Sequence, residues 1–147
     1  MARDIVSSKK RSEMMRNVRQ QRTPSEKRVG QMLYKMGRRF RYNNRSLPGS
    51  PDLSNQREGW AIFVNGCFWH GHKNCPKTKS NSSPRIPARN AHFWSAKIFS
   101  NRLRDARNCR RVRQLGIRAV IIWECQLRSV DKVNETLRRM VRADDRR

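Results

Sequence analysis

The chain has 147 residues, the usual size of one domain, and its 35 Lys and Arg residues far outnumber its 11 Asp and Glu residues. The formal net charge of +24 would make a compact fold repel itself unless a polyanion neutralised it, and nucleic acid is the obvious polyanion. No apolar run approaches the roughly 20 residues of a spanning helix, and no signal-peptide core follows Met1, so we expect a cytoplasmic protein without membrane contact.

The first predicted elements are a basic arm, a helix and an edge strand. Residues 1–22 are polar and basic, with apolar residues at helical spacing, and could form either a short amphipathic helix or a disordered arm. Residues 23–26 predict a helix start, with a Thr N-cap, a Pro in the first helical position and Glu26 closing a capping box. The helix should end at Gly37, and residues 39–42 alternate basic and aromatic side chains as an edge strand does.

Two strands and a long loop are predicted next. The turn-rich residues 47–51 deliver Asp52 to the start of one strand. Residues 60–64 form a short, continuous apolar run typical of a buried strand, and a hairpin should join the two strands. Residues 65–91 are rich in Gly, Pro, Asn, Ser, Lys, His and Cys, so this long loop needs its own cross-link to stay ordered.

The last predicted elements are a helix, a strand and a second helix. Residues 92–115 carry a basic helical pattern that Gly116 closes, residues 118–123 form a third apolar strand, and residues 130–141 form an amphipathic helix. This order predicts an α/β fold, with a mixed central sheet flanked by helices. We expect a single domain that spans residues 1–147.

The four cysteines favour metal ligation over disulfides, because no export signal is present and the cytosol keeps thiols reduced. The candidate ligands are two thiols and an imidazole within nine positions, and a thiol after the last strand: Cys67, His72, Cys75 and Cys125. Three Cys and one His suit tetrahedral zinc, and such a closed site is structural. Cys109 competes with Cys125 for the fourth position, His70 competes with His72, and unconnected buried thiols are the other interpretation.

One longer string is more specific than any of these patterns. It reads FVNGCFWHGH at residues 63–72, and three further blocks are LPGSPD at 47–52, FW at 93–94 and WEC at 123–125. In this order the blocks strongly resemble the very-short-patch-repair (Vsr-type) DNA mismatch endonucleases, from about residue 8 to residue 142. The resemblance implies a restriction-endonuclease-like fold.

The resemblance also implies an activity. The family recognises a T:G mismatch left by deamination of 5-methylcytosine, and it cuts one strand on the 5′ side of the mismatched T. Magnesium serves the chemistry and zinc serves the structure. By this resemblance we expect a bacterial, nucleoid-associated enzyme that acts as a monomer on double-stranded DNA, with mismatch-repair proteins as candidate partners.

Individual residues match the family's functional positions. Asp52 matches the carboxylate that holds magnesium, Val64 supplies a backbone carbonyl near that metal, and His70 matches the histidine that activates the attacking water. Glu26 matches an acidic residue that orients metal-bound water. The aromatic group that wedges into the base stack beside the mismatch is matched by Phe68, Trp69 and Trp94. The zinc ligands are matched by Cys67, His72, Cys75 and Cys125.

The chemistry suits these residue types, although each has a simpler interpretation. Phosphodiester hydrolysis needs a deprotonated water and positive charge against the developing negative charge, which magnesium held by one or two carboxylates supplies. Asp52 could instead cap a turn, and the capping box alone explains Glu26. Insertion of aromatic side chains costs least at a mismatched base step, but Phe and Trp are also common in cores.

The chain departs from the family at two places. Asn65 stands where the family carries His or Asp beside the metal, and an amide can neither act as a general base nor carry a negative charge. We therefore expect weakened turnover with DNA binding intact. Two residues separate His72 from Cys75 where some relatives have one, and ligation should survive this. The alternative function is a zinc-stabilised DNA-binding protein without nuclease turnover, and charge alone supports a third, a ribosome-associated protein.

Overall fold

A four-stranded mixed sheet forms the centre of the computed structural model, which describes residues 9, 22–67, 70–72, 75 and 88–142. The strand order is β1 (Arg41–Tyr42), β2 (Leu53–Asn55), β3 (Trp60–Asn65) and β4 (Arg118–Trp123). β2 pairs antiparallel with both β1 and β3, whereas β3 and β4 run parallel. The predicted hairpin and the predicted edge strand are therefore both present.

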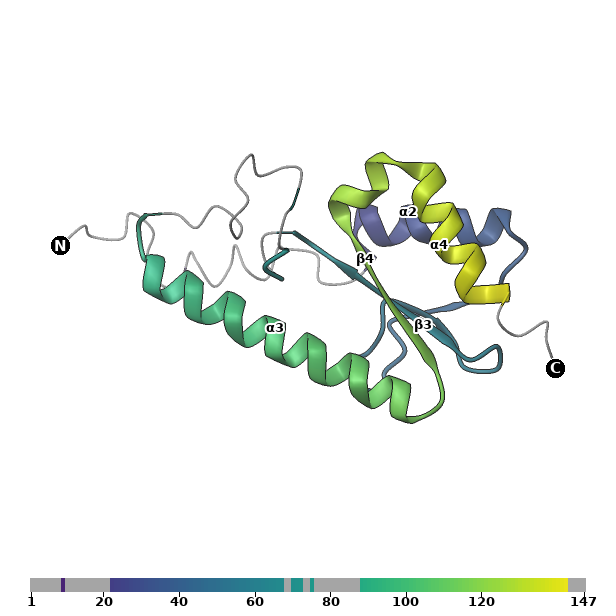
Figure 1. The fold of residues 1–147 in the computed structure, drawn as a ribbon, viewed down its shortest axis with the longest axis horizontal. Helices are drawn as coiled ribbons and strands as arrows, with labels where there is room; N and C mark the ends of the chain where they lie inside the picture. The colour runs from purple at the N-terminus through teal and green to yellow at the C-terminus, as the bar shows by residue number, and fades with distance from the viewer. Residues whose placement is uncertain (1–8, 10–21, 68–69, 73–74, 76–87, 143–147) are drawn as a thin grey trace.

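Helices cover both faces of this sheet (Figure 1). α2 (Pro24–Lys35) and α4 (Val130–Arg142) lie together on one face, and the 24-residue α3 (Ala91–Gln114) lies along the other. This layering confirms the predicted α/β class and is compatible with a restriction-endonuclease-like fold. The sequence reasoning missed one element, the short 3-10 helix η1 (Glu124–Arg128) between β4 and α4.

α2 begins and ends where its sequence predicts. Thr23 Oγ1 accepts a hydrogen bond from the backbone N–H of Glu26 at 3.3 Å, and Gly37 follows the helix with a φ of 72°. Only the Thr23 half of the predicted capping box is formed. The Glu26 side chain is buried near Asp52 instead of folding back onto Thr23, so the capping box does not explain this residue.

The two faces of the sheet bury different side chains. The face under α2 and α4 holds the larger cluster, built on Val29, Leu33, Leu53, Trp60, Ile62, Ile122 and Leu137. The face under α3 holds a smaller cluster, built on Leu47, Ala61, Val112, Ile117 and Ala119. Within β3, Ile62 and Val64 face α2 and α4, while Ala61 and Phe63 face α3. Because side chains alternate along a strand, Asn65 is on the α3 side.

Three predictions concern segments outside the described residues. They are the form of the basic arm at residues 1–22, of which only residues 9 and 22 are described, most of the loop at residues 65–91, and the placement of Phe68 and Trp69. In the part of the chain that the structure describes, no helix has the length and apolar character needed to cross a membrane.

Candidate functional site

Asp52 directly precedes β2, beside the second half of β3. The antiparallel register places Leu53 against Ile62, so the next step along the hairpin brings Asp52 to the residues that close β3. Its Oδ2 atom accepts a hydrogen bond of 2.7 Å from the backbone N–H of Val64. The turn predicted before this strand therefore presents the Asp52 carboxylate at the rim of the sheet, beside the backbone of Val64.

A second carboxylate, that of Glu26 on α2, lies close to Asp52. Burial raises the pKa of Asp52 to about 7, the Val64 N–H opposes that rise, and the nearby Glu26 charge adds to it, while His70 lowers the pKa slightly. Glu26 is only 3% exposed, and its Oε2 atom is buried without a hydrogen-bond partner. Two buried acids with an unpartnered oxygen form an electrostatically incomplete site that a divalent cation would complete.

His70 forms a side-chain pair with Asp105 on α3. The Nδ1 atom of His70 lies 2.5 Å from Oδ2 of Asp105, and both side chains are partly buried. The loop after β3 brings His70 into this position, where its backbone N–H donates to the carbonyl of Gly66 at 3.2 Å. A carboxylate at Nδ1 accepts a hydrogen bond from the N–H of that nitrogen, which leaves Nε2 as the basic atom of the ring.

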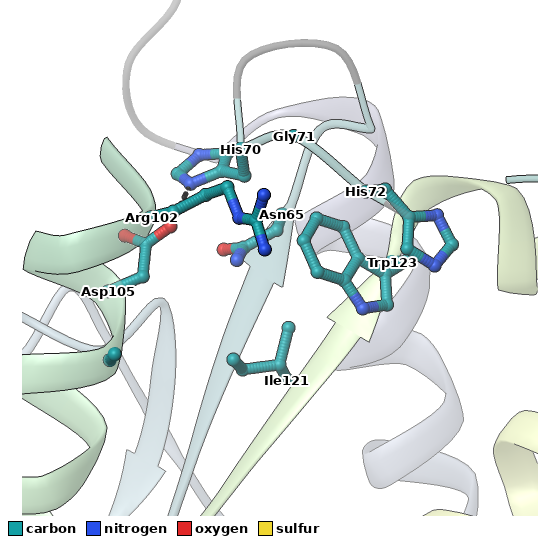
Figure 2. Close-up of a pocket in the computed structure, with 9 residues that line it drawn as sticks. Asn65, His70, Gly71, His72, Arg102, Asp105, Ile121 and Trp123 are labelled. Carbon is teal, nitrogen blue, oxygen red and sulfur yellow. Dashed lines mark hydrogen bonds and ion pairs between the residues drawn. The ribbon is translucent and has the colours of Figure 1, made fainter. Parts of the chain in front are cut away.

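A pocket of about 310 Å³ lies beside this pair, between the loop, α3 and the ends of β3 and β4. Asn65, His70, Arg102, Asp105 and Trp123 are among its lining residues, and Figure 2 shows their side chains gathered around it. Asn65 is 4% exposed. The structure therefore places Asn65, the residue at which the chain departs from the family, in the same pocket as His70.

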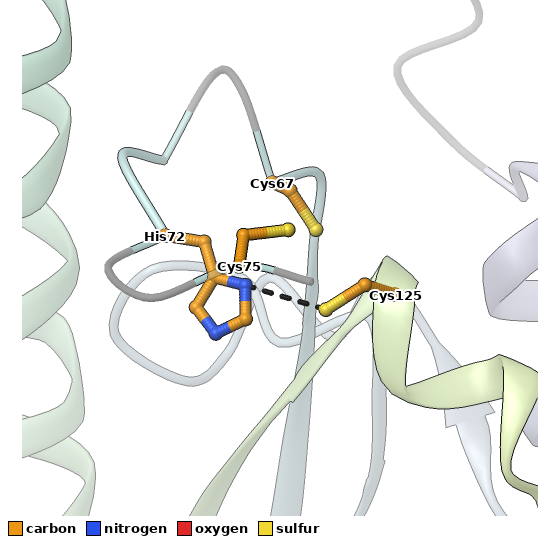
Figure 3. A group of neighbouring side chains, drawn as sticks. All are labelled: Cys67, His72, Cys75 and Cys125. Atoms are coloured by element: carbon orange, nitrogen blue, oxygen red, sulfur yellow. Dashed lines mark hydrogen bonds between the residues drawn. The ribbon is translucent and has the colours of Figure 1, made fainter. Parts of the chain in front are cut away.

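The four candidate metal ligands converge on one point (Figure 3). The ligand atoms of Cys67, His72, Cys75 and Cys125 all lie within 4.8 Å of one another. In a tetrahedral zinc site with Zn–S distances near 2.3 Å, the sulfur atoms are about 3.8 Å apart. The cluster, which joins the loop after β3 to the start of η1, could hold a metal ion. The competing choices Cys109 and His70 are not part of this cluster.

Burial keeps these donors neutral in the absence of a metal ion. Desolvation raises the pKa of Cys125 to about 12, with the neighbouring thiols adding to the rise, and it also raises the pKa of Cys67. Burial lowers the pKa of His72, whose Nδ1 lies 3.3 Å from the Cys125 sulfur. The His72 ring stacks on Trp123 at 4.2 Å with an interplanar angle of 10°, which fixes its orientation. A bound cation would reverse the thiol shifts, because thiolate is the form that binds metal.

Comparison with known proteins decides the family. The model of the family described as "DNA mismatch endonuclease Vsr" matches residues 3–77, which include Glu26, Asp52, Cys67 and His70. This chain belongs to the Vsr family. It is 38% identical to the DNA mismatch endonuclease Vsr of Escherichia coli (strain K12) over 132 residues, which cover 90% of this chain and 80% of that protein.

Two further relatives of this Vsr-family chain are named as nicking enzymes. One is the type II nicking enzyme V.XorIIP of Xanthomonas oryzae, 34% identical over 94% of this chain and 96% of that protein. The other is V.NmeAIP of Neisseria meningitidis, 34% identical over 95% of this chain and 94% of that protein. The chain therefore belongs to a family whose named members are DNA mismatch endonucleases and nicking enzymes.

Asp105 is the residue of this Vsr-family site that sequence reasoning missed. It lies in the middle of a basic helix, where a lone carboxylate is easily read as a surface charge. One signal was available, because Asp105 is the only acidic residue between Glu58 and Glu124. An isolated carboxylate in such a basic stretch is a candidate partner for a histidine.

Trp94 is the one intercalation candidate that the structure describes. It lies in the first turn of α3, where its backbone N–H donates to the Asn90 carbonyl at 3.1 Å. Its ring packs edge to face against Phe93 at 5.3 Å, and Phe93 is 56% exposed. This pair at the end of α3 is separate from the two core clusters. That location favours a surface role for Trp94 over core packing.

Proposed function

We propose that this endonuclease nicks one strand of duplex DNA on the 5′ side of the T in a T:G mismatch left by deamination of 5-methylcytosine, the first step of very short patch repair. The observation that supports it best is the meeting of Asp52, Glu26 and His70 at one end of the sheet. A protein that only bound DNA would have no need for two buried acids there, which repel both each other and phosphate.

Magnesium is the metal that this pair of acids would hold. Mg²⁺ takes oxygen ligands and is typically bound through one or two carboxylates, so Asp52 would be its main ligand, with the Val64 carbonyl beside it and Glu26 orienting its water. When bound, the ion supplies positive charge to the phosphate and lowers the pKa of water. The raised pKa of Asp52 and the unpartnered oxygen of Glu26 support this assignment.

His70 would serve as the general base. Asp105 holds the imidazole through Nδ1, which leaves Nε2 to take the proton of the attacking water. The water oxygen then bonds to phosphorus as the bond to the leaving oxygen breaks, and the leaving oxygen takes up a proton. Asp105 acts as a positioning residue in this scheme, because it fixes the orientation and tautomer of His70 without touching the DNA.

Zinc is the metal that the Cys and His cluster would hold, in a structural role. Its donor set of three thiols and one imidazole is that of a closed tetrahedral site. His72 lies two residues after His70, so ligation of His72 would also restrain the general base. The structural ion would thus hold the loop after β3 in place without entering the reaction.

DNA would be held by phosphate neutralisation and by aromatic insertion. The net charge of +24 supplies the first, and Trp94 with Phe68 and Trp69 would supply the second, as a wedge beside the mismatch. A mismatched step costs least to open, so insertion favours the T:G site over paired DNA. We propose that the enzyme acts as a monomer in this complex.

The test is a nicking assay on a duplex with one T:G mismatch, with each strand labelled in turn and resolved on a denaturing gel. We expect magnesium-dependent cleavage of the T strand alone, at the phosphate 5′ of the mismatched T. The controls are the same duplex with a T:A pair and the variant Asp52→Ala, and neither should yield product. Without metal, Asp52→Ala should bind the mismatched duplex at least as tightly as the parent. Equal nicking by Asp52→Ala and the parent would remove Asp52 from the mechanism.

A further inference from the structure

The pocket beside His70 contains an arginine that has no role in the reaction proposed so far. Arg102, on α3, lines this pocket together with Asn65, His70 and Asp105. Figure 2 shows its side chain leaving α3 and its guanidinium pointing into the pocket beside Asn65 and Trp123. Among the described residues, Arg102 is the arginine that lines this pocket.

The stem of Arg102 is held in place by Gly71, in the loop after β3. A Cβ atom at Gly71 would lie 2.8 Å from Cδ of Arg102 and 2.6 Å from Cγ2 of Ile98. Gly71 also has a φ of 62°, a conformation that favours glycine. The loop backbone therefore lies directly on the aliphatic part of Arg102 and limits where its guanidinium can point.

Within the part of the chain that the structure describes, the guanidinium of Arg102 has no protein partner, in contrast to those of Arg118 and Arg113. Arg118 donates to the carbonyls of Met140 at 2.8 Å and Glu58 at 3.1 Å, and Arg113 donates to the carbonyl of Ala119 at 3.1 Å. Among the described residues, no carbonyl or carboxylate accepts a hydrogen bond from Arg102. Asp105, one turn further along α3, is already paired with His70.

The neutral side chain of Asn65 makes the positive charge of Arg102 important in this pocket. The amide is neutral, so β3 contributes no cation to the wall of the pocket. Arginine presents a planar set of donors that matches a phosphate, and its charge persists at every working pH. A fixed cation aimed at the place where negative charge develops acts mainly on the transition state. Arg102 therefore has the chemistry, the position and the free donors to meet a phosphate in this pocket.

We propose that Arg102 contacts a non-bridging oxygen of the scissile phosphate and stabilises the negative charge that grows there during cleavage. This proposal rests on the nicking activity proposed above and adds a catalytic residue to it. In this mechanism Asp52 binds the metal and His70 takes the proton of the attacking water, whereas Arg102 contacts the phosphate from the α3 side. It supplies from a helix the positive charge that the neutral Asn65 does not supply from the strand.

The first measurement compares single-turnover nicking at saturating protein. Arg102→Gln keeps the hydrogen-bonding end and most of the stem, and it should lower the rate constant by about 100-fold, as loss of one transition-state donor does. Arg102→Lys keeps the positive charge but lacks the paired N–H donors of the guanidinium, so it should recover part of the lost nicking rate. Arg104→Gln is the matched control, because it removes the same charge from an exposed position on α3. At saturation it should nick within about threefold of the parent.

The second measurement uses binding without magnesium and does not depend on activity. The probe is the T:G duplex with a neutral methylphosphonate at the phosphate 5′ of the mismatched T. Parent and Arg104→Gln should each bind it about fivefold or more weakly than the ordinary duplex, whereas Arg102→Gln should bind both equally, because its contact is already gone.

The outcomes separate the two proposals. Failure of the parent to nick the T:G duplex would refute the proposed function, and the methylphosphonate comparison would still decide whether Arg102 meets that phosphate. The inference is wrong if Arg102→Gln nicks at the rate of Arg104→Gln. It is also wrong if the methylphosphonate weakens binding by Arg102→Gln as much as it weakens binding by the parent, because Arg102 is then a general DNA-binding residue.

Discussion

His70 and Asp105 are 35 positions apart in the chain, yet Nδ1 of His70 lies 2.5 Å from Oδ2 of Asp105. The loop after β3 carries the histidine and α3 carries the carboxylate, so the pair depends on how the loop lies on the helix. Gly71 makes that contact possible, because a larger residue there would collide with Ile98 and Arg102.

The His70–Asp105 pair predicts that Asp105→Asn slows nicking without unfolding the protein. The amide can bond either tautomer of the imidazole, so Nε2 is no longer reserved for the water proton, and a loss of about 100-fold or more is expected. The measurements are the single-turnover rate, the melting temperature and the affinity for the mismatched duplex. A rate equal to that of the parent, with the other two quantities unchanged, would show that Asp105 does not position His70.

The raised pKa of Asp52 predicts a pH-dependent penalty on the metal-free fold. Between pH 3.8 and about 7 the unfolded chain has already lost this proton while the folded protein still holds it, so folding stability falls as pH rises. The effect is up to roughly 4 kcal/mol at about 1.4 kcal/mol per pKa unit. Asp52→Asn should therefore be more stable than the parent at pH 8 and nearly equal to it at pH 4.

Thermal unfolding in magnesium-free buffer checks this pH dependence. The buffer should contain no chelator, so that the Cys and His cluster keeps any metal it holds. Adding Mg²⁺ at pH 8 should raise the melting temperature of the parent, because the ion binds only the folded state, and should have little effect on Asp52→Asn. A stability difference between parent and variant that is the same at both pH values would contradict the raised pKa.

The Cys and His cluster offers a matched pair of cysteine variants. Cys125→Ser removes a ligand, whereas Cys109→Ser replaces another buried thiol, on α3, that is not part of the cluster. We expect about one zinc ion per chain in the parent and in Cys109→Ser, and much less in Cys125→Ser. Loss of the ion should lower the melting temperature by roughly 10 °C or more, since structural zinc contributes several kcal/mol to folding.

Elemental analysis and thermal unfolding of the three proteins provide the check on the cluster. Equal zinc content in Cys125→Ser and Cys109→Ser would disprove the assigned ligand set. The pKa of Cys125, raised to about 12 by burial, adds a pH test, because protons then compete strongly with the metal. Retained zinc should therefore decrease as the pH is lowered.

Asn65 predicts a gain of activity on substitution. Its side chain is in the pocket of His70 and Asp105, and neither a base nor a charge is present at this position. Asn65→His or Asn65→Asp should raise the single-turnover nicking rate by roughly tenfold, because each introduces a group that can handle protons or bind metal. Nicking by both variants no faster than the parent would show that this position does not limit the chemistry.

Local signals in the sequence were sufficient to predict the main elements of the fold. Strand β4 coincides with the predicted apolar run at residues 118–123, and α2 begins at its Thr23 cap. Both features depend on near neighbours in the chain. The sequence also predicted that Cys67, His72, Cys75 and Cys125 come together, and the structure places their ligand atoms within 4.8 Å of one another. The 3-10 helix η1 was missed because it is a single short turn without apolar periodicity.

The sequence by itself determined which residue types were available for chemistry, and with the family motif it singled out Asp52, Glu26 and His70. Only the tertiary structure decided which of them meet. The capping box explained Glu26 fully in the sequence, yet the folded protein buries its carboxylate near Asp52 with one oxygen unpartnered. Asp105 carried only the signal of a lone acid in a basic stretch and Arg102 carried none, because their surroundings come from α3 crossing a loop distant in sequence. Burial and proximity across the fold set their electrostatics, and chain order encodes neither directly.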